Sequence, residues 1–302
     1  MESDIPPEVI SPIMSIPRYD RLQELPGQQP CIEPIPFAQL ESLLTKSALS
    51  PGSQEITRAL LRWGIPRHFP GGGLGLEYGP LFKTAARPDL FTHHINEVTA
   101  HLHEQRIDLL VIPGMSGYPI GAMYSQASGI PAVLLKKQTH GEITADPPPP
   151  GAFLIPSYTG DGDTLIAADM TAVSAILEEV IARKLNPDGQ VVEIRIAGAD
   201  EIIDKATMAT AITETAPVFC RAAAEAICSR RSPDHAIELR VSFVAWVTPL
   251  IKGYNRSQDL LRERFDISPF AGLSLTSLQN DPAAVGIDGL GVVAFAPGSS
   301  NS

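Results

Sequence analysis

The chain has 302 residues, of which 44% are hydrophobic and 19% are charged, and its formal net charge is -11. This composition is typical of a soluble globular protein with a sizeable core. The acidic balance argues against nucleic-acid binding, because contacts with a phosphate backbone need a basic face. No apolar run reaches the ~20 residues of a membrane span, and the acidic, proline-rich start has no secretory-signal pattern. We therefore expect a cytoplasmic protein that binds a small molecule.

The N-terminal part of the chain predicts helices after an irregular lead. Residues 1–35 are rich in proline and show no apolar period, so we expect an extended arm. Apolar residues at helical spacing then predict helices near 37–44 and 53–63. The glycine-rich run 71–76 has neither a preceding strand nor a following Lys-Ser/Thr pair, so a turn or hairpin is the better interpretation than a phosphate loop. A third helix is predicted over 88–105.

Four histidines, His93, His94, His101 and His103, lie along the predicted helix 88–105. Two pairs of them share a helical face, which raises the question of a metal site. Zinc normally needs a third ligand and an orienting second shell, and neither is visible in the sequence. We expect solvated surface histidines and no metal ligands among them. The three cysteines are too few for a disulfide framework.

The middle of the chain alternates apolar runs with short polar segments. The apolar runs predict strands that should be neighbours in one mostly parallel sheet with right-handed crossovers, at 107–112, 131–136, 152–156 and 191–197. The first strand leads into a small-residue loop at 114–118, the second into a basic loop at 136–142, and the third into a Gly/Asp loop at 157–164. A helix is predicted over 165–184. The carboxyl edge of such a sheet is where open α/β folds bind ligands.

These three loops resemble those of the type I phosphoribosyltransferases, most closely the orotate and adenine branches. In that family a short glycine-containing loop holds pyrophosphate, and Gly114-Met115-Ser116-Gly117-Tyr118 is similar to it. The next strand ends in a basic pair that opens a mobile catalytic loop, similar to Lys136-Lys137, and the orotate enzymes carry His-Gly-Glu in that loop, as in His140-Gly141-Glu142. The family's third signature is an apolar run, two acids and a Thr-Gly-Gly-Thr-like turn at a helix start. We assign this signature to residues 155–164, and the resemblance as a whole covers roughly residues 72–200.

The sequence departs from the family pattern at this third signature. Pro156 and Ser157 stand where the family has two adjacent acids that hold the ribose hydroxyls. Asp161 and Asp163 flank Gly162 in a turn that is neutral in the family. A fixed carboxylate would compete with a bound phosphate at a helix N-terminus, because free amides and the helix dipole favour either anion.

The resemblance also implies how the chain is divided. A Pro-rich arm at 1–35 precedes a helical hood and hairpin at 36–87, a phosphoribosyltransferase-like core at 88–200 and a C-terminal α/β extension at 201–302. In the extension we expect helices at 200–213, 217–230 and 248–265, and strands at 237–247 and 285–295.

By resemblance, the function is transfer of ribose 5-phosphate from phosphoribosyl diphosphate to a nitrogenous base. Lys136, Lys137 and His140 would neutralise the leaving pyrophosphate, and Mg²⁺ would bridge donor oxygens. The substrate-binding residues implied by the resemblance are Met115, Ser116, Gly117, Tyr118, Ser157, Tyr158, Thr159, Gly160, Gly162 and Thr164.

Two alternatives stay open at the level of sequence. In the first, the fold is repurposed for lyase, cyclase or isomerase chemistry on an unphosphorylated specialised metabolite. Asp161 and Asp163 would then be the acids, since a carboxyl group among apolar side chains has a raised pKa, and no cofactor is expected. A simpler interpretation is that Asp161 or Asp163 caps the following helix, which would leave the other acid free for catalysis. In the second alternative, the chain is a ligand-binding regulator without turnover. We expect a homodimer in each case.

Overall fold

The computed structural model describes residues 37–63, 65–68, 74–77, 91–138, 151–156, 163–185, 191–231, 237–280 and 283–294. The helices in these ranges are α3 (Phe37–Lys46), α4 (Pro51–Trp63), α5 (Thr92–Glu104), α6 (Gly114–Ser128), α7 (Met170–Lys184), α8 (Thr207–Arg231), the 3₁₀ turn η3 (Gly253–Asn255) and α9 (Ser257–Phe265). The strands are β1 (Ile65–His68), β2 (Leu74–Glu77), β3 (Leu109–Pro113), β4 (Ala132–Gln138), β5 (Ala152–Pro156), β6 (Asp163–Ala167), β7 (Val191–Ala199), β8 (Ile202–Ile203), β9 (Glu238–Lys252), β10 (Phe270–Asn280), β11 (Ala283–Ile287) and β12 (Gly291–Ala294).

One 10-stranded sheet organises the described part of the chain, in the order β12-β11-β10-β9-β7-β3-β4-β6-β5 with β8 paired to β9. Its middle strands, from β10 through β9, β7 and β3 to β4, are all parallel. Both edges are antiparallel: β11 and β12 lie on one side, and β6 and β5 on the other. The structure therefore confirms the expected α/β class with a mostly parallel sheet flanked by helices.

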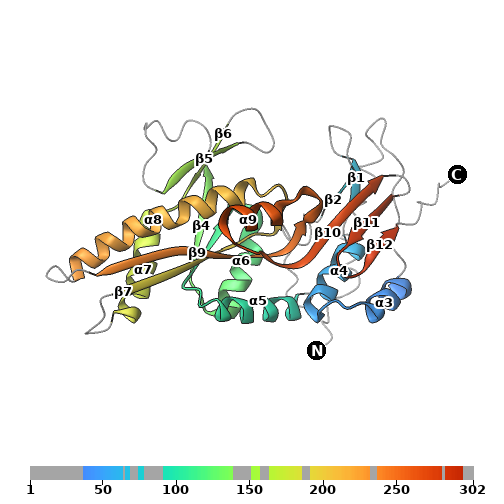
Figure 1. Ribbon diagram of the computed structural model, residues 1–302, viewed down its shortest axis with the longest axis horizontal. Coiled ribbons are helices and arrows are strands. Elements are labelled where there is room, and N and C mark those ends of the chain that lie inside the picture. Colours follow the sequence, from blue (N-terminus) through green and yellow to red (C-terminus); the bar gives the residue numbers. More distant parts are fainter. Residues whose placement is uncertain are drawn as a thin grey trace, which may run out of the picture.

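Helices cover both faces of the parallel strands (Figure 1). Along β3 the side chains alternate: Leu109 and Val111 pack in a cluster with α7 and α8, whereas Leu110 and Ile112 pack in a cluster with α5 and α6. All five residues of β3 are buried. A strand buried on both faces is read from the sequence as a continuous apolar run, which is why its position could be predicted.

A separate apolar cluster lies at the other end of the sheet. There α3 and α4 pack against the strands β10 to β12, with Leu44, Ile56, Leu60, Leu273 and Val285 all buried. Figure 1 shows these elements together on the right. The predicted N-terminal helices are thus present, and they cover the C-terminal strands. The run 65–77 forms the antiparallel pair β1 and β2, as expected for a hairpin, while residues 69–73 lie outside the described residues.

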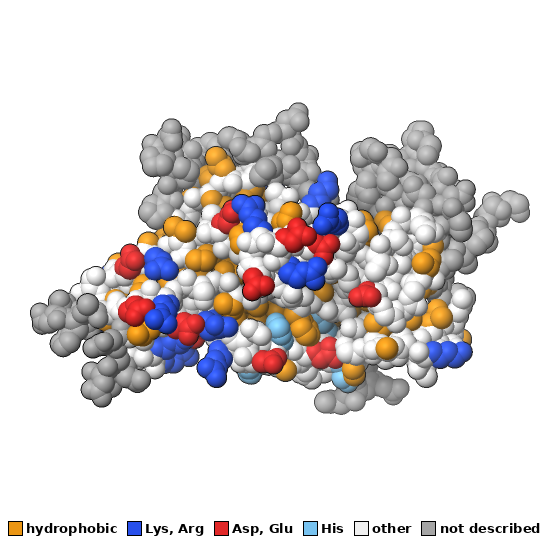
Figure 2. All heavy atoms as spheres, viewed as in Figure 1, with side chains coloured by type: hydrophobic (Ala, Val, Ile, Leu, Met, Phe, Trp, Pro, Cys, Tyr) orange, Lys and Arg blue, Asp and Glu red, His pale blue; other side chains and the backbone are white. Residues whose placement is uncertain are grey.

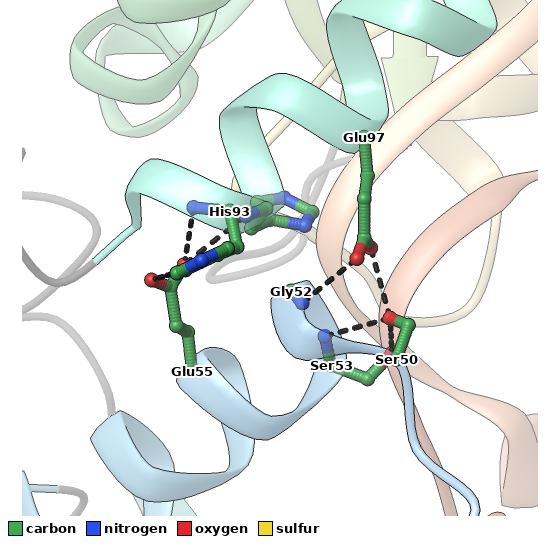
Figure 3. A network of polar contacts seen from close by, with 7 residues as sticks. Ser50, Gly52, Ser53, Glu55, His93 and Glu97 are labelled. Atoms are coloured by element: carbon green, nitrogen blue, oxygen red, sulfur yellow. Dashed lines mark hydrogen bonds and ion pairs between the residues drawn. The ribbon is translucent and has the colours of Figure 1, made fainter.

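The helices α4 and α5 are joined by carboxylates that cap each other's N-termini (Figure 3). Glu97 of α5 accepts hydrogen bonds from the Gly52 amide and the Ser50 hydroxyl, both at 2.9 Å. In return, Glu55 of α4 accepts from the amides of His93 at 2.8 Å and His94 at 3.1 Å. The first amides of a helix lack intrahelical partners and carry the positive end of the helix dipole. The reciprocal capping therefore stabilises the contact between α4 and α5.

Several predicted element boundaries are wrong. The helix predicted from Leu165 begins at Met170, after strand β6, and the helices predicted at 200–213 and 217–230 are one 25-residue helix, α8, with Pro217 inside it. Proline removes only one backbone donor, and the buried stripe of α8 continues on both sides of it. The segment predicted as a helix from Thr248 starts as the last part of β9, continues as the 3₁₀ turn η3, and becomes α-helical only in α9.

The surface seen in Figure 2 mixes acidic and basic side chains over α8 and α9. Salt bridges join Arg262 to Asp259 and Arg264 to Glu214 on this face. Charges of the described residues are therefore interspersed here and are not gathered by sign. Among the same residues, no helix has the length and apolar character needed to cross a membrane.

Candidate functional site

The order of the parallel strands defines where a ligand site is expected. The parallel strands lie side by side in the order β4, β3, β7, β9 and β10. If they are numbered by their order along the chain, this spatial order is 2-1-3-4-5. The neighbours β3 and β7 are thus a pair from which the chain leaves in different directions. After β3 it enters α6, which packs with α5, and after β7 it enters α8, which packs with α7 on the opposite face. In open α/β sheets the crevice outside the carboxyl ends at such a switch point binds ligands.

On the β3 side, the predicted loop at 114–118 is wrong in form, because these residues are the first turns of α6. Pro113 is the N-cap residue, and Gly114 turns the chain with a φ of 60°, which glycine adopts readily. Residues 115–118, including Ser116 and Gly117, therefore stay at the carboxyl end of β3, where the free amides of a helix N-terminus point. The sequence predicted this place but not its helical conformation.

On the β7 side, the structure places two acids that the sequence reasoning missed. Asp200 and Glu201 directly follow β7. A Cβ atom added to Gly117 would lie 2.8 Å from Oδ1 of Asp200, so glycine is what allows the first turn of α6 to approach this carboxylate. The Glu201 amide donates to the same Oδ1 at 2.9 Å. The two sides of the switch point thus meet at Gly117 and Asp200.

The signal that could have found these acids was present in the sequence. Three parts of the family signature, an apolar strand, two acids and a helix start, have counterparts in β7, Asp200-Glu201 and α8 from Thr207, whereas its Thr-Gly-Gly-Thr-like turn has none in residues 202–207. The assignment of this signature to 155–164 was wrong, because that segment is not followed by a helix and does not border β3. Both β5 and β7 are apolar runs that follow the basic pair in the sequence, and β7 is the one that borders β3.

The turn before α8 holds a third acid in an ion pair. Asp204 accepts from Nζ of Lys252 at 2.5 Å and from Nδ2 of Asn255 at 2.5 Å. Both side chains of the ion pair are mostly buried, with 21% of Lys252 and 17% of Asp204 exposed. Lys252 is the last residue of β9 and Asn255 lies in η3, so the C-terminal part of the chain reaches the edge of the candidate site.

The basic pair lies near the end of β4, but the predicted loop at 136–142 is wrong at its start, because residues 136–138 are still strand residues of β4. Lys136 and Lys137 are exposed, and they pair with Ala167 and Ile166 of the antiparallel strand β6. The strand is anchored just before them, because the hydroxyl of Tyr118 donates to the carbonyl of Leu135 at 2.5 Å. Burial raises the pKa of Tyr118. His140 lies outside the described residues.

The expected Gly/Asp turn at a helix start is wrong as well. Thr164 is buried in β6 opposite Ile155, and the backbone of Asp163 pairs with Pro156. The cap of α7 is Asp169, which accepts from the amides of Thr171 and Ala172. Strand β5 is an edge strand, separated from β4 by β6, so it is not the parallel neighbour that was predicted. Asp161, Gly162 and residues 157–160 lie outside the described residues.

The histidines of α5 are not all solvated. His94 is fully buried, and its Nε2 lies 2.6 Å from the hydroxyl of Tyr124. Burial lowers the pKa of His94 to about 3. His93 contacts Glu55 through Nδ1 at 2.6 Å, and His101 stacks on Phe270. In the part of the chain that the structure describes, no group of three or more His, Cys, Asp or Glu side chains is arranged to hold a metal ion.

The fold is that of an α/β protein with a largely parallel sheet, and Asp200 and Glu201 lie at its switch point. Solved structures with a similar chain path are adenine phosphoribosyltransferases. The enzyme of Thermoanaerobacter pseudethanolicus is 14% identical, covers 72% of this chain and 98% of its own, and has a TM-score of 0.46. The Giardia lamblia enzyme is 14% identical, covers 72% of this chain and 97% of its own, and has a TM-score of 0.45. The Saccharomyces cerevisiae enzyme is 20% identical, covers 73% of this chain and 98% of its own, and has a TM-score of 0.42. No protein-family model and no curated protein matches the sequence. Identities and scores this low carry no argument about activity, which has to come from the site.

Proposed function

We propose that this chain is a phosphoribosyltransferase-like enzyme that transfers ribose 5-phosphate from phosphoribosyl diphosphate to a nitrogenous base. The observation that carries the proposal is the pair Asp200 and Glu201, which follows β7 at the switch point, with Asp200 close to the first turn of α6 at Gly117. Adjacent acids are suited to hold the two hydroxyls of a ribose ring, since a carboxylate accepts hydrogen bonds from both.

Each part of the site has a role in this reaction. The free amides at the start of α6, with Ser116, would hold the pyrophosphate. Lys136 and Lys137, exposed at the end of β4, would neutralise the charge that develops as the bond between the anomeric carbon and pyrophosphate breaks. His140, two residues after the end of β4, would act with them. The base nitrogen forms the new bond to the anomeric carbon, so the protein mainly positions the reactants and stabilises charge.

A magnesium ion fits this donor set. Mg²⁺ prefers oxygen ligands and commonly uses one or two carboxylates together with substrate oxygens, and Asp200 and Glu201 supply such carboxylates. These two residues would hold the ion. When bound, it would offset negative charge on the pyrophosphate.

The direct test is a calorimetric titration of the native protein with phosphoribosyl diphosphate and Mg²⁺. We expect saturable binding that Asp200→Asn weakens at least about 10-fold, because a charge-assisted contact is lost. Asp288→Asn, in the exposed turn between β11 and β12, is the matched control and should bind as the native protein does. Absence of binding by the native protein would refute the proposal.

A second candidate function is favoured by the ion pair of Asp204. This carboxylate engages the donors Lys252 and Asn255 immediately before α8, so a ligand phosphate at that turn would have to compete with Asp204 for them. The second candidate is acid–base chemistry on an unphosphorylated metabolite, with Asp161 and Asp163 as the acids. In that case Asp161→Asn and Asp163→Asn should abolish turnover, and activity should fall as pH rises through the pKa of the acid.

Titration with ribose 5-phosphate separates the two candidates. If Asp204 competes with phosphate for Lys252, Asp204→Asn should bind ribose 5-phosphate at least about 10-fold tighter than the native protein, because the lysine charge is then free to attract the phosphate. Equal affinities would remove the observation that favours the second candidate.

A chain that binds ligands with no turnover of any of them would instead be a regulator. The expected homodimer is checked by light scattering at several protein concentrations.

A further inference from the structure

The hydroxyl of Tyr118 links two parts of the candidate site that are distant in sequence. Tyr118 lies in the second turn of α6, whereas its acceptor, the carbonyl of Leu135, belongs to β4. Lys136 and Lys137 follow this carbonyl directly. The contact therefore joins the segment expected to hold pyrophosphate to the segment expected to neutralise it.

The position of this carbonyl in the sheet explains why a side chain bonds to it. In the parallel ladder of β3 and β4, the amide of Leu110 donates to the carbonyl of Pro131, and Leu110 pairs with Ala132. The pattern repeats every two residues, so the carbonyl of Leu135 faces residue 114. There β3 has ended, and the chain turns into α6 with a positive φ. The phenolic hydroxyl donates at the place where the ladder stops.

Strand β4 also changes its partner at this point. Residues up to Leu135 pair with β3, and residues from Lys136 onward pair with β6. Beyond Leu135 the strand is held by an edge hairpin, whose Leu154 is 52% exposed, and no longer by the central sheet. The hydrogen bond from the Tyr118 hydroxyl to the Leu135 carbonyl thus connects α6 to the residue directly before the two lysines.

We propose that Tyr118 is a positioning residue, whose hydroxyl fixes Lys136 and Lys137 relative to the N-terminus of α6, and that it is not a substrate contact. This proposal rests on the proposed function, in which both segments act on one pyrophosphate. The raised pKa of the phenol keeps the hydroxyl protonated, as a donor must be.

Tyr118→Phe tests the proposal, because it removes the hydroxyl and keeps the ring. The matched control is Ser125→Ala on the same helix. Ser125 also donates its hydroxyl to a backbone carbonyl, that of Ile130 at 2.6 Å, but at the opposite end of α6. Both variants lose one such bond and should show similar small losses in thermal midpoint. Two measurements follow: pyrophosphate release from phosphoribosyl diphosphate with a panel of nucleobases, and amide hydrogen exchange at residues 136–138.

For Tyr118→Phe we expect kcat to fall about 10- to 100-fold, since a small misplacement of catalytic groups has effects of this size. KM for the donor should change less than about 3-fold because binding groups are intact. Exchange at 136–138 should be faster than in the native protein. Ser125→Ala should keep native kcat and native exchange in this segment.

Three results would overturn the proposal. They are an unchanged kcat in Tyr118→Phe, an equal loss of kcat in Ser125→Ala, and a rise in KM alone, which would make Tyr118 a substrate contact. If the native protein turns over no base, the proposed function fails and the exchange measurement decides by itself. Unchanged exchange at 136–138 in Tyr118→Phe then refutes the positioning role, and faster exchange supports it.

Discussion

Replacing Glu97 by alanine should weaken the attachment of helix α4 to helix α5 and so destabilise the protein. The substitution removes two hydrogen bonds to an ionised acceptor, from the Gly52 amide and the Ser50 hydroxyl. Such bonds contribute about 1.5–3 kcal/mol each, and a carboxylate at a helix N-terminus adds about 0.3–1 kcal/mol. Ser50 keeps its second role, because its hydroxyl still accepts from the Ser53 amide at 3.1 Å. Glu97 is half-buried, so we take the low end of each range and expect a loss of about 3 kcal/mol.

The assay is equilibrium urea denaturation, combined with amide exchange in the first turns of α4 and α5. Glu97→Gln keeps an acceptor oxygen and loses the charge, so it should lose about 1 kcal/mol. Glu104→Ala, at the exposed C-terminal end of the same helix, should stay within about 0.5 kcal/mol of the native protein. If Glu97→Ala proves as stable as Glu104→Ala, the reciprocal capping contributes nothing, and the reasoning is refuted.

Two other substitutions test the buried histidine and the meeting point of the site. Burial lowers the pKa of His94 to about 3 in the folded protein, whereas the pKa of an exposed histidine in the unfolded chain is about 6.5. Between these two values only the unfolded chain binds a proton at His94, so the free energy of unfolding should decrease as pH falls below about 6.5. The loss is about 2 kcal/mol between pH 6.5 and 5. His94→Gln should remove this part of the pH dependence in urea denaturation at pH 7 and 5; an identical dependence would show that His94 titrates normally. Gly117→Ala puts a Cβ 2.8 Å from Oδ1 of Asp200 and should weaken donor binding about 10-fold in calorimetry. Native affinity would mean that this approach is not part of the site.

The parallel centre of the fold was predictable because its strands are buried on both faces. Leu109–Pro113 is an unbroken apolar run, and the helices around it have one buried stripe each. The short strand β5 is also apolar in sequence, which made it look central. Its Leu154 is half exposed because the strand is at the sheet edge. An apolar run of this length cannot by itself report how many neighbours a strand has.

The site was predictable in part for the same reason. The carboxyl end of β3 and the pair Lys136 and Lys137 follow directly from strand ends. Asp200 and Glu201 were missed although they follow an apolar run, because two apolar runs compete for the place beside β3, and the sheet order shows that β7, and not β5, occupies it. The ion pair of Asp204 with Lys252 joins residues 48 positions apart. Such a contact depends on tertiary packing and leaves no local pattern in the sequence.

The place of β9 between β7 and β10 has a consequence for how the chain folds during synthesis. Until residues 238–252 have left the ribosome, β7 has an open edge with the unpaired backbone of Ile194 and Ile196, although β3 already covers its other side. Open strand edges invite pairing with other chains, and contacts between residues far apart in sequence form slowly. A chain truncated after Ala199 would keep that edge permanently and should aggregate. The C-terminal third is therefore needed to close the central sheet.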